Sequence, residues 1–263
     1  MSGKLAGQNF VIIGGTDGLG LSAAQALIRS GASVVAVGLK DESVDRAAKK
    51  LGNQACVMQG DATHEATAVL AIENCIKDFG GFNGLYHVAG GSGRAFGDGP
   101  LHDLTVSGWN KTMEINLTSL MLSNRAAVQK FQAQKTSGSI LNMGSVLGFS
   151  PSPKYFTTHA YAAAKSAVIG FTKSIAAAYA KDNIRVNVIA PALVETPMSI
   201  RASANPDIMN FIKTKQPLDG GRIGKPEDLD ELVVYLLSDS SRFITGQVFA
   251  VDGGWSVTEG QYV

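Results

Sequence analysis

Short apolar runs alternate with amphipathic segments along most of the 263-residue chain. The first run, residues 9–14, is rich in β-branched side chains and lacks polar alternation, which is typical of a strand buried on both faces. Residues 21–29 follow with apolar positions at helical spacing. The predicted strands are 9–14, 33–38, 55–59, 84–90, 138–144, 184–190 and 246–254, and the predicted helices are 21–29, 42–51, 64–78, 109–134, 161–181 and 226–237.

Seven strands that alternate with helices predict a parallel sheet covered on both faces, because each parallel connection must cross over the sheet. No repeat, charge block or linker interrupts the alternation, so we predict a single α/β domain over residues 1–263. Open α/β sheets bind ligands beyond the carboxyl ends of their strands. We therefore expect substrate loops at about 91–100, 146–160 and 191–215.

The composition narrows the class of protein further. The chain is 45% hydrophobic and 17% charged, with a formal net charge of +1. This charge gives no reason to expect nucleic acid or an anionic membrane as a partner. No apolar run approaches the ~20 residues that span a bilayer, and the start lacks a signal-peptide pattern, so we expect a cytoplasmic protein. The two cysteines and four histidines show no metal-ligand spacing, and we expect no metal.

A glycine-rich turn joins the first predicted strand to the first predicted helix. The segment reads Gly14-Gly-Thr16-Asp17-Gly18-Leu19-Gly20. In this context glycines let the backbone approach a pyrophosphate closely, and the helix N-terminus offers free N–H groups to the anion. The segment therefore predicts dinucleotide binding.

The second strand ends in Gly38-Leu39-Lys40-Asp41, where many NAD-binding units carry an acid for the ribose hydroxyls. Lys40 is suited to a 2′-phosphate, whereas Asp17 would repel one, so the two hints oppose each other. Asp61, just past the third strand, is suited to accept a hydrogen bond from the adenine amine or to cap the following helix. We expect NAD or NADP as cofactor, with NAD favoured.

Tyr161 and Lys165 lie four residues apart, on one face of a predicted helix. A phenol titrates near pH ~10, and a nearby cation favours its ionised form, so this spacing suits acid/base chemistry. The same spacing is common on exposed helices, so the pair alone is weak evidence. Ser145 follows the fifth strand directly. Asn116 lies in a helix interior, where it either serves chemistry or ties the helix to a strand.

In order and spacing, these motifs are similar to those of the short-chain dehydrogenase/reductase family over essentially the whole chain. Gly14, Gly18 and Gly20 match the family's glycine turn, and residues 190–198 match the segment that holds the nicotinamide amide. The resemblance implies a Rossmann-type doubly wound sheet. It implies a catalytic set of Asn116, Ser145, Tyr161 and Lys165. It implies cofactor contacts from Gly14, Thr16, Asp17, Gly18, Leu19, Gly20, Leu39, Lys40, Asp61, Ala62, Ala89, Gly90, Tyr161, Lys165, Pro191, Val194 and Thr196.

The reaction implied is hydride transfer between nicotinamide and a secondary alcohol or ketone. Tyr161 would exchange the proton, Ser145 would bind the reacting oxygen, and Lys165 would lower the pKa of Tyr161 and bind the nicotinamide ribose. Asn116 would hold a water that relays the proton. A non-catalytic regulator that senses cofactor redox state stays open as an alternative, as does epimerisation or dehydration, although the chain lacks the extra substrate domain of such enzymes.

Three departures from the family pattern stand out. His87-Val-Ala-Gly90 replaces the usual Asn-Asn-Ala-Gly, which puts the hydrogen bonding of strand four in doubt. Ala192 replaces a common glycine. Ser145 and Tyr161 are sixteen positions apart (161 − 145), about three more than usual, which indicates an insertion that shapes the substrate pocket. The catalytic motif requires a lysine four residues after the tyrosine. Tyr155 does not match it, because His159 occupies that position.

The substrate is the least determined part of the prediction. Phe96, Tyr155 and Met198 lie in loops near the expected nicotinamide position and hint at an apolar or ring-shaped substrate, while Arg94 and His159 would suit a polar or acidic group. Family members commonly assemble as tetramers through two long helices and the last strand. We therefore expect a small-molecule alcohol or ketone as substrate, and a homotetramer or dimer.

Overall fold

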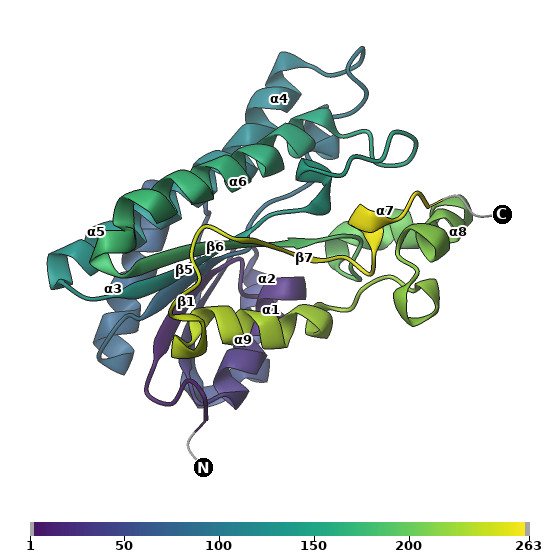
Figure 1. Cartoon of the computed structure of the whole chain (residues 1–263). Helices are drawn as coiled ribbons and strands as arrows, with labels where there is room; N and C mark the ends of the chain where they lie inside the picture. The colour runs from purple at the N-terminus through teal and green to yellow at the C-terminus, as the bar shows by residue number, and fades with distance from the viewer. Residues whose placement is uncertain (1–2, 261–263) are drawn as a thin grey trace.

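The computed structural model describes residues 3–260. Its strands form one sheet in the order β3-β2-β1-β4-β5-β6-β7, and every neighbouring pair is parallel (Figure 1). The strands are β1 (Asn9–Ile13), β2 (Ser33–Gly38), β3 (Ala55–Gln59), β4 (Gly84–His87), β5 (Gly138–Met143), β6 (Ile184–Pro191) and β7 (Val248–Val251). The predicted seven-stranded, doubly wound parallel sheet is confirmed.

Helices cover both faces of the sheet, as Figure 1 shows. The helices are α1 (Gly18–Arg29), α2 (Asp41–Leu51), α3 (Glu65–Phe79), α4 (Val106–Met113), α5 (Ser119–Gln134), α6 (His159–Tyr179), α7 (Ile200–Ser203), α8 (Pro206–Lys215) and α9 (Asp230–Leu237). Successive strand side chains point to opposite faces. Phe10 and Ile12 of β1 pack in a core with α1, α2 and α9, whereas Val11 and Ile13 pack with α3, α5 and α6.

The helix predicted over residues 109–134 is longer and less regular than expected. It begins at Val106, because the Thr105 hydroxyl accepts a hydrogen bond from the Gly108 N–H at 2.9 Å and caps the helix. A π-helical turn, Glu114–Thr118, separates α4 from α5. Periodicity alone does not show such a turn, because it inserts one residue into an otherwise helical pattern.

Other boundaries differ by a few residues. Helix α1 begins at Gly18 rather than Leu21, because the Asp17 carboxylate accepts the Gly18 N–H and starts the helix inside the glycine turn. Strand β4 ends at His87, and β7 is shorter than predicted at both ends. The residues beyond these strands belong instead to the turns at the rim of the sheet.

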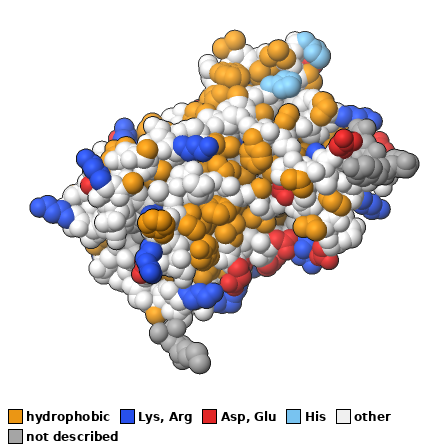
Figure 2. Space-filling view, in the orientation of Figure 1, with side chains coloured by type: hydrophobic (Ala, Val, Ile, Leu, Met, Phe, Trp, Pro, Cys, Tyr) orange, Lys and Arg blue, Asp and Glu red, His pale blue; other side chains and the backbone are white. Residues whose placement is uncertain are grey.

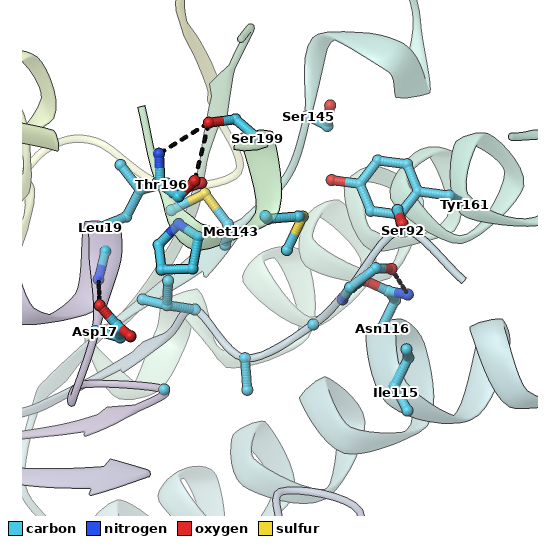
Figure 3. Close-up of a pocket in the computed structure, with 18 of the residues that line it drawn as sticks. Asp17, Leu19, Ser92, Ile115, Asn116, Met143, Ser145, Tyr161, Thr196 and Ser199 are labelled. Carbon is cyan, nitrogen blue, oxygen red and sulfur yellow. Dashed lines mark hydrogen bonds between the residues drawn. The ribbon is translucent and has the colours of Figure 1, made fainter. Parts of the chain in front are cut away.

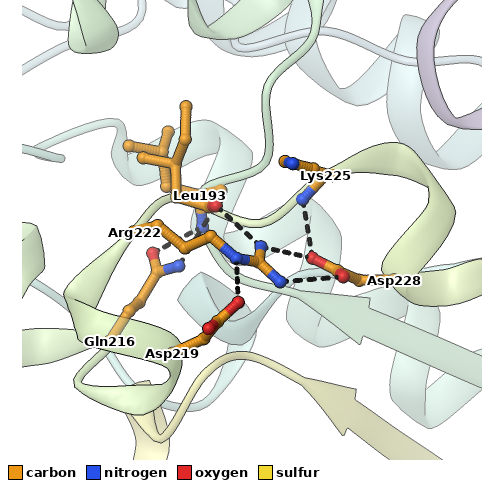
Figure 4. A network of polar contacts seen from close by, with 7 residues as sticks. Leu193, Gln216, Asp219, Arg222, Lys225 and Asp228 are labelled. Carbon is orange, nitrogen blue, oxygen red and sulfur yellow. Dashed lines mark hydrogen bonds and ion pairs between the residues drawn. The ribbon is translucent and has the colours of Figure 1, made fainter.

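The segment after β6 is fixed by a polar network (Figure 4). The Gln216 amide donates to the Leu193 carbonyl at 3.2 Å and accepts from the Leu193 N–H at 3.0 Å. Arg222 donates two bonds to Asp228, at 2.7 and 3.0 Å, and one to Asp219 at 2.6 Å. This segment lies at the carboxyl ends of the strands, so the network holds one wall of the cavity there.

Candidate active site

A cavity of about 800 Å³ runs along the carboxyl ends of the strands. Its volume lies in the range of small-molecule sites. Figure 3 shows Asp17 and Leu19 at one end and Tyr161, Ser145 and Asn116 at the other. The predicted site residues that line it are Gly14, Thr16, Asp17, Gly18, Leu19, Leu39, Lys40, Asp61, Ala62, Ala89, Gly90, Arg94, Phe96, Asn116, Ser145, Tyr161, Lys165, Pro191, Val194, Thr196 and Met198.

The glycine turn forms a bare backbone wall of the cavity. Gly14 has φ +89°, and a Cβ there would lie 2.7 Å from the Ala89 nitrogen. Gly20, which we predicted at the cofactor, does not line the cavity. A Cβ on Gly20 would lie 1.9 Å from the Gly14 carbonyl oxygen, so this glycine lets α1 pack against the turn. The turn and the N-terminus of α1 fit the pyrophosphate of a dinucleotide.

Charged side chains of both signs meet at the end of the cavity beside α2, where we expect the adenosine of the cofactor and which we call the adenosine end. Arg46 of α2 lies 3.6 Å from the Asp17 carboxylate, and Lys40 and Glu42 also line the cavity there. We did not predict Arg46 from the sequence, because a single surface arginine in a helix is not part of a recognisable binding motif. Asp61 accepts bonds from the N–H and the hydroxyl of a neighbouring threonine, which lower the pKa of its carboxyl group. It does not cap α3, whose N-cap is His64.

Ser145 and Tyr161 project into the same part of the cavity (Figure 3). Ser145 caps a short 3₁₀ turn, Val146–Gly148, by accepting the Leu147 N–H at 3.2 Å. That turn packs directly on α6, because a Cβ on Gly148 would lie 2.9 Å from the backbone carbon of Lys165. The close packing brings the serine of one segment to the tyrosine of another.

Lys165 does not lower the pKa of Tyr161 below its usual value, which corrects our expectation. Burial raises the pKa of the Tyr161 phenol, and the Ser145 hydroxyl offsets this only in part. The Lys165 ammonium lies 5.6 Å from the centre of the Tyr161 ring and donates to the Met143 carbonyl at 2.8 Å. Burial lowers the pKa of Lys165 to about 8.

Asn116 is fully buried inside the π-helical turn. Its amide nitrogen donates to the carbonyls of Gly91 and Thr112, at 2.8 and 2.9 Å, and its amide oxygen accepts the Gly91 N–H at 3.1 Å. The side chain therefore ties the helix to the loop after β4, rather than to a strand as we considered. A widened turn at a functional site is a common use of π-helical geometry.

The sequence put the hydrogen bonding of strand four in doubt, because His87 departs from the family pattern there. In the structure, His87 forms hydrogen bonds at the end of this strand. The ring is fully buried, with Nδ1 2.8 Å from the Ser123 hydroxyl and Nε2 3.2 Å from the Ala89 carbonyl. Burial, and then the charge of Lys165, lower the pKa of His87 to about 3. A neutral histidine thus anchors the end of β4 to α5.

The insertion before Tyr161 packs on the C-terminal part of the chain. The buried indole of Trp255 donates to the Ser150 carbonyl at 3.1 Å, and the Phe156 ring meets it edge-on at 5.5 Å. Phe156 lines the cavity, but Tyr155 and His159, which we predicted at the substrate, do not. Tyr155 packs against Phe211, and His159 is exposed beside a smaller, separate cavity.

A buried carboxylate that the sequence reasoning missed holds the start of the Tyr161 helix. Asp98, in the glycine-rich loop after β4, accepts the N–H of Ala160 at 3.0 Å and that of Tyr161 at 2.9 Å. A negative charge at a helix N-terminus satisfies free N–H groups and favours the helix dipole. No local signal reveals this contact, because the partners are 62 and 63 residues apart.

Within residues 3–260, no three His, Cys, Asp or Glu side chains gather as possible metal ligands. In the same range, none of the helices combines the length and apolar character needed to cross a membrane.

Comparisons with known proteins agree with this geometry. The family model described as Enoyl-(Acyl carrier protein) reductase matches residues 14–256. The chain is 35% identical to 2-(S)-hydroxypropyl-CoM dehydrogenase 3 of Xanthobacter autotrophicus, covering 97% of this chain and 98% of that one. It is 32% identical to cis-4-hydroxycyclohexanecarboxylate dehydrogenase of Sinomonas cyclohexanicum, covering 94% and 95%. It is 35% identical to a 3-alpha-(or 20-beta)-hydroxysteroid dehydrogenase of Mycobacterium tuberculosis, covering 97% and 91%.

A solved structure of a short-chain type dehydrogenase/reductase from Mycobacterium ulcerans superposes with a TM-score of 0.87 and 27% identity, covering 97% of this chain and 91% of that one. The chain belongs to the short-chain dehydrogenase/reductase family. It is an NAD(P)-dependent oxidoreductase that acts on secondary alcohols and ketones. The alternative of a non-catalytic regulator finds no support in these comparisons.

The contact between Asp98 and α6 gives a first prediction. Replacing Asp98 with alanine leaves two buried N–H groups unpaired, which should lower the free energy of unfolding by about 1–3 kcal/mol. Because the Tyr161 backbone loses its anchor, turnover should fall about 10- to 100-fold. Urea unfolding and hydrogen exchange at Ala160 and Tyr161 measure the local effect.

The control is Asp103→Ala, which removes an exposed carboxylate shortly after the same loop. It should leave both measurements unchanged. Normal stability and normal exchange protection in Asp98→Ala would show that Asp98 does not hold the helix.

Proposed function

We propose that Tyr161 is the acid/base group for interconversion of a secondary alcohol and a ketone. The observation that carries the proposal is the meeting of Tyr161 and Ser145 in the same cavity as the glycine turn. In oxidation, the alcohol loses its hydroxyl proton to Tyr161 and a hydride from carbon, giving ketone, reduced cofactor and one proton. The bound nicotinamide supplies the hydride acceptor, or the donor in reduction.

Ser145 donates a hydrogen bond to the reacting oxygen, where negative charge accumulates between alcohol and ketone. The buried Lys165 ammonium, held by its hydrogen bond to the Met143 carbonyl, would bind the ribose of the nicotinamide. Asn116 keeps the loop after β4 in place and is the group beside which a relay water would lie. A Cβ on Gly90 would lie 2.6 Å from the Asn116 amide oxygen, so only a glycine fits beside Asn116.

A substitution at Tyr161 tests the assignment. Tyr161→Phe should reduce turnover of a ketone that the natural chain reduces by about 10²–10⁴-fold, the usual range for acid/base catalysis. NADH affinity, followed by cofactor fluorescence, should change less than about twofold, because the phenol ring keeps its place. Tyr179→Phe, at the far end of the same helix, serves as the matched control. Full activity in Tyr161→Phe would sink the assignment.

We propose NAD as the preferred cofactor. Lys40 and Arg46 line the adenosine end, but the three acids Asp17, Glu42 and Asp61 line it too, so the two cations are fully offset. A 2′-phosphate adds about two negative charges, which such a site does not favour. The Asp17 carboxylate, 3.6 Å from Arg46, competes directly with a phosphate for that guanidinium.

Titration with NADH and NADPH at fixed ionic strength measures this preference, and the natural chain should bind NADH more tightly. Asp17→Asn keeps an N-cap for α1 and removes one charge. It should improve NADPH affinity relative to NADH by roughly fivefold, about 1 kcal/mol for an exposed pair. Asp207→Asn, in α8, is the control. Tighter NADPH binding by the natural chain would contradict the proposal.

We propose that the chain assembles as a homotetramer, or a dimer, in part through β7. This strand forms an open edge of the sheet, and Figure 2 shows apolar side chains gathered over β7 and α9. Phe243 is fully exposed, and Tyr235 is 39% exposed. Exposed apolar groups beside an open edge favour association. Sedimentation velocity should show an oligomer that Phe243→Asp weakens, whereas a monomeric natural chain would contradict assembly.

We propose the cytoplasm as the location. Cys56 and Cys75 are free thiols, which suits a reducing compartment. Fractionation of cells that produce the chain would test this, since recovery with the periplasm or outside the cell would contradict it.

A further inference from the structure

Two arginines from distant segments meet at the substrate end of the cavity. Arg94 lies in the loop after β4, and Arg201 lies in α7, 107 positions later (201 − 94). Both side chains line the cavity. One guanidinium nitrogen of each lies 3.5 Å from the same acceptor, the Tyr155 carbonyl oxygen. This distance is at the outer limit of a hydrogen bond, so most of their donors are not engaged by that carbonyl.

Neither guanidinium is paired with a carboxylate within residues 3–260. Other arginines of this part of the chain, such as Arg29, Arg125 and Arg222, lie within 4.0 Å of an Asp or Glu oxygen. Arg94 and Arg201 have no such partner in the described residues. Burial, and then the like charge of Arg201, lower the pKa of Arg94, so the two cations repel each other.

The nearby acids offset only part of the charge of this pair. Asp98 is the acid that acts on Arg94, and its single negative charge, which hydrogen bonds from the neutral N–H groups at the start of α6 leave in place, offsets one of the two cations. Lys111 also lines the cavity, and its charge is matched by Glu114 at 2.9 Å. The acids that line the cavity lie at the adenosine end: Asp17 and Asp61 follow β1 and β3, and Glu42 lies in the first turn of α2. The substrate end therefore has uncompensated positive charge.

We infer that the substrate carries an anionic group, a carboxylate or a sulfonate, which Arg94 and Arg201 bind together while Tyr161 and Ser145 engage the reacting oxygen. This inference rests on the proposed function and names the class of its substrate. Two planar guanidiniums offer the forked donor geometry that matches a carboxylate or sulfonate. Binding the anion also relieves the repulsion between the two cations.

The cofactor phosphates do not explain this pair of cations. The glycine turn and the N-terminus of α1 lie where a pyrophosphate fits, whereas both arginines contact the insertion that leads to Tyr161. Phe96, Phe156 and Met198 also line the cavity. These side chains suit an apolar ring or chain between the anion and the reacting carbon.

Matched acids and amides test the inference. The purified chain with its preferred cofactor is assayed on 4-acetylbenzoate, 4-acetylbenzenesulfonate and 4-oxopentanoate, each against its neutral amide or sulfonamide. A charge-assisted hydrogen bond contributes about 1.5–3 kcal/mol, so kcat/KM should be about 10- to 100-fold higher for the acids. The preference of the carboxylates over the sulfonate, or the reverse, identifies the anion.

Arg94→Met and Arg201→Met should each reduce the acid-to-amide ratio, and the double variant should abolish it, while activity on the neutral ketones and NADH affinity stay within about twofold. Arg242→Met, an exposed arginine that does not line the cavity, should keep the full ratio.

Equal kcat/KM for acids and amides in the natural chain would overturn the inference and leave the proposed function standing. An unchanged acid-to-amide ratio in the double variant would do the same. A loss of NADH affinity in the arginine variants would overturn it too, because the pair would then serve the cofactor. Failure to turn over any ketone or alcohol with either cofactor would instead refute the proposed function, on which the inference rests.

Discussion

The hydrogen bond from the Lys165 ammonium to the Met143 carbonyl is the contact on which the catalytic end of the cavity depends. It joins the first turns of α6 to the end of β5, and its charge is buried at 2% exposure. A buried cation is costly unless it is hydrogen-bonded, so this contact tolerates little displacement. The turn after Ser145 packs against the same residue through Gly148. One fixed position of α6 therefore sets Tyr161, Lys165 and Ser145 together.

The start of α6 is held from the other side by the loop after β4. Asp98 accepts the N–H of Tyr161, and Asn116 bonds both backbone groups of Gly91 at the beginning of that loop. The loop that contains Arg94 is thus tied to the helix that contains the catalytic tyrosine. A substrate anion held by Arg94 would be positioned relative to the reacting oxygen through this short, hydrogen-bonded path.

The cavity has a different electrostatic character at its two ends. At the adenosine end, Asp17, Glu42 and Asp61 offset Lys40 and Arg46. At the substrate end, Arg94 and Arg201 remain without carboxylate partners in residues 3–260. Relatives of this chain are named for different alcohols, one a carboxylate and one a steroid. On a shared sheet, substrate choice is made by such loop side chains.

The sequence by itself determined the sheet, the glycine turn and the pair Tyr161 and Lys165, because strand burial, turn geometry and helical spacing are local properties that a run of residues displays. It did not determine the π-helical turn at Asn116, the caps that start α1 and α4 early, or the raised pKa of Tyr161, which depends on burial. Asp98 and the pairing of Arg94 with Arg201 were decided only by the tertiary structure. These contacts join residues 46 to 63 positions apart, and only the packing of loops at one edge of the sheet brings such residues together.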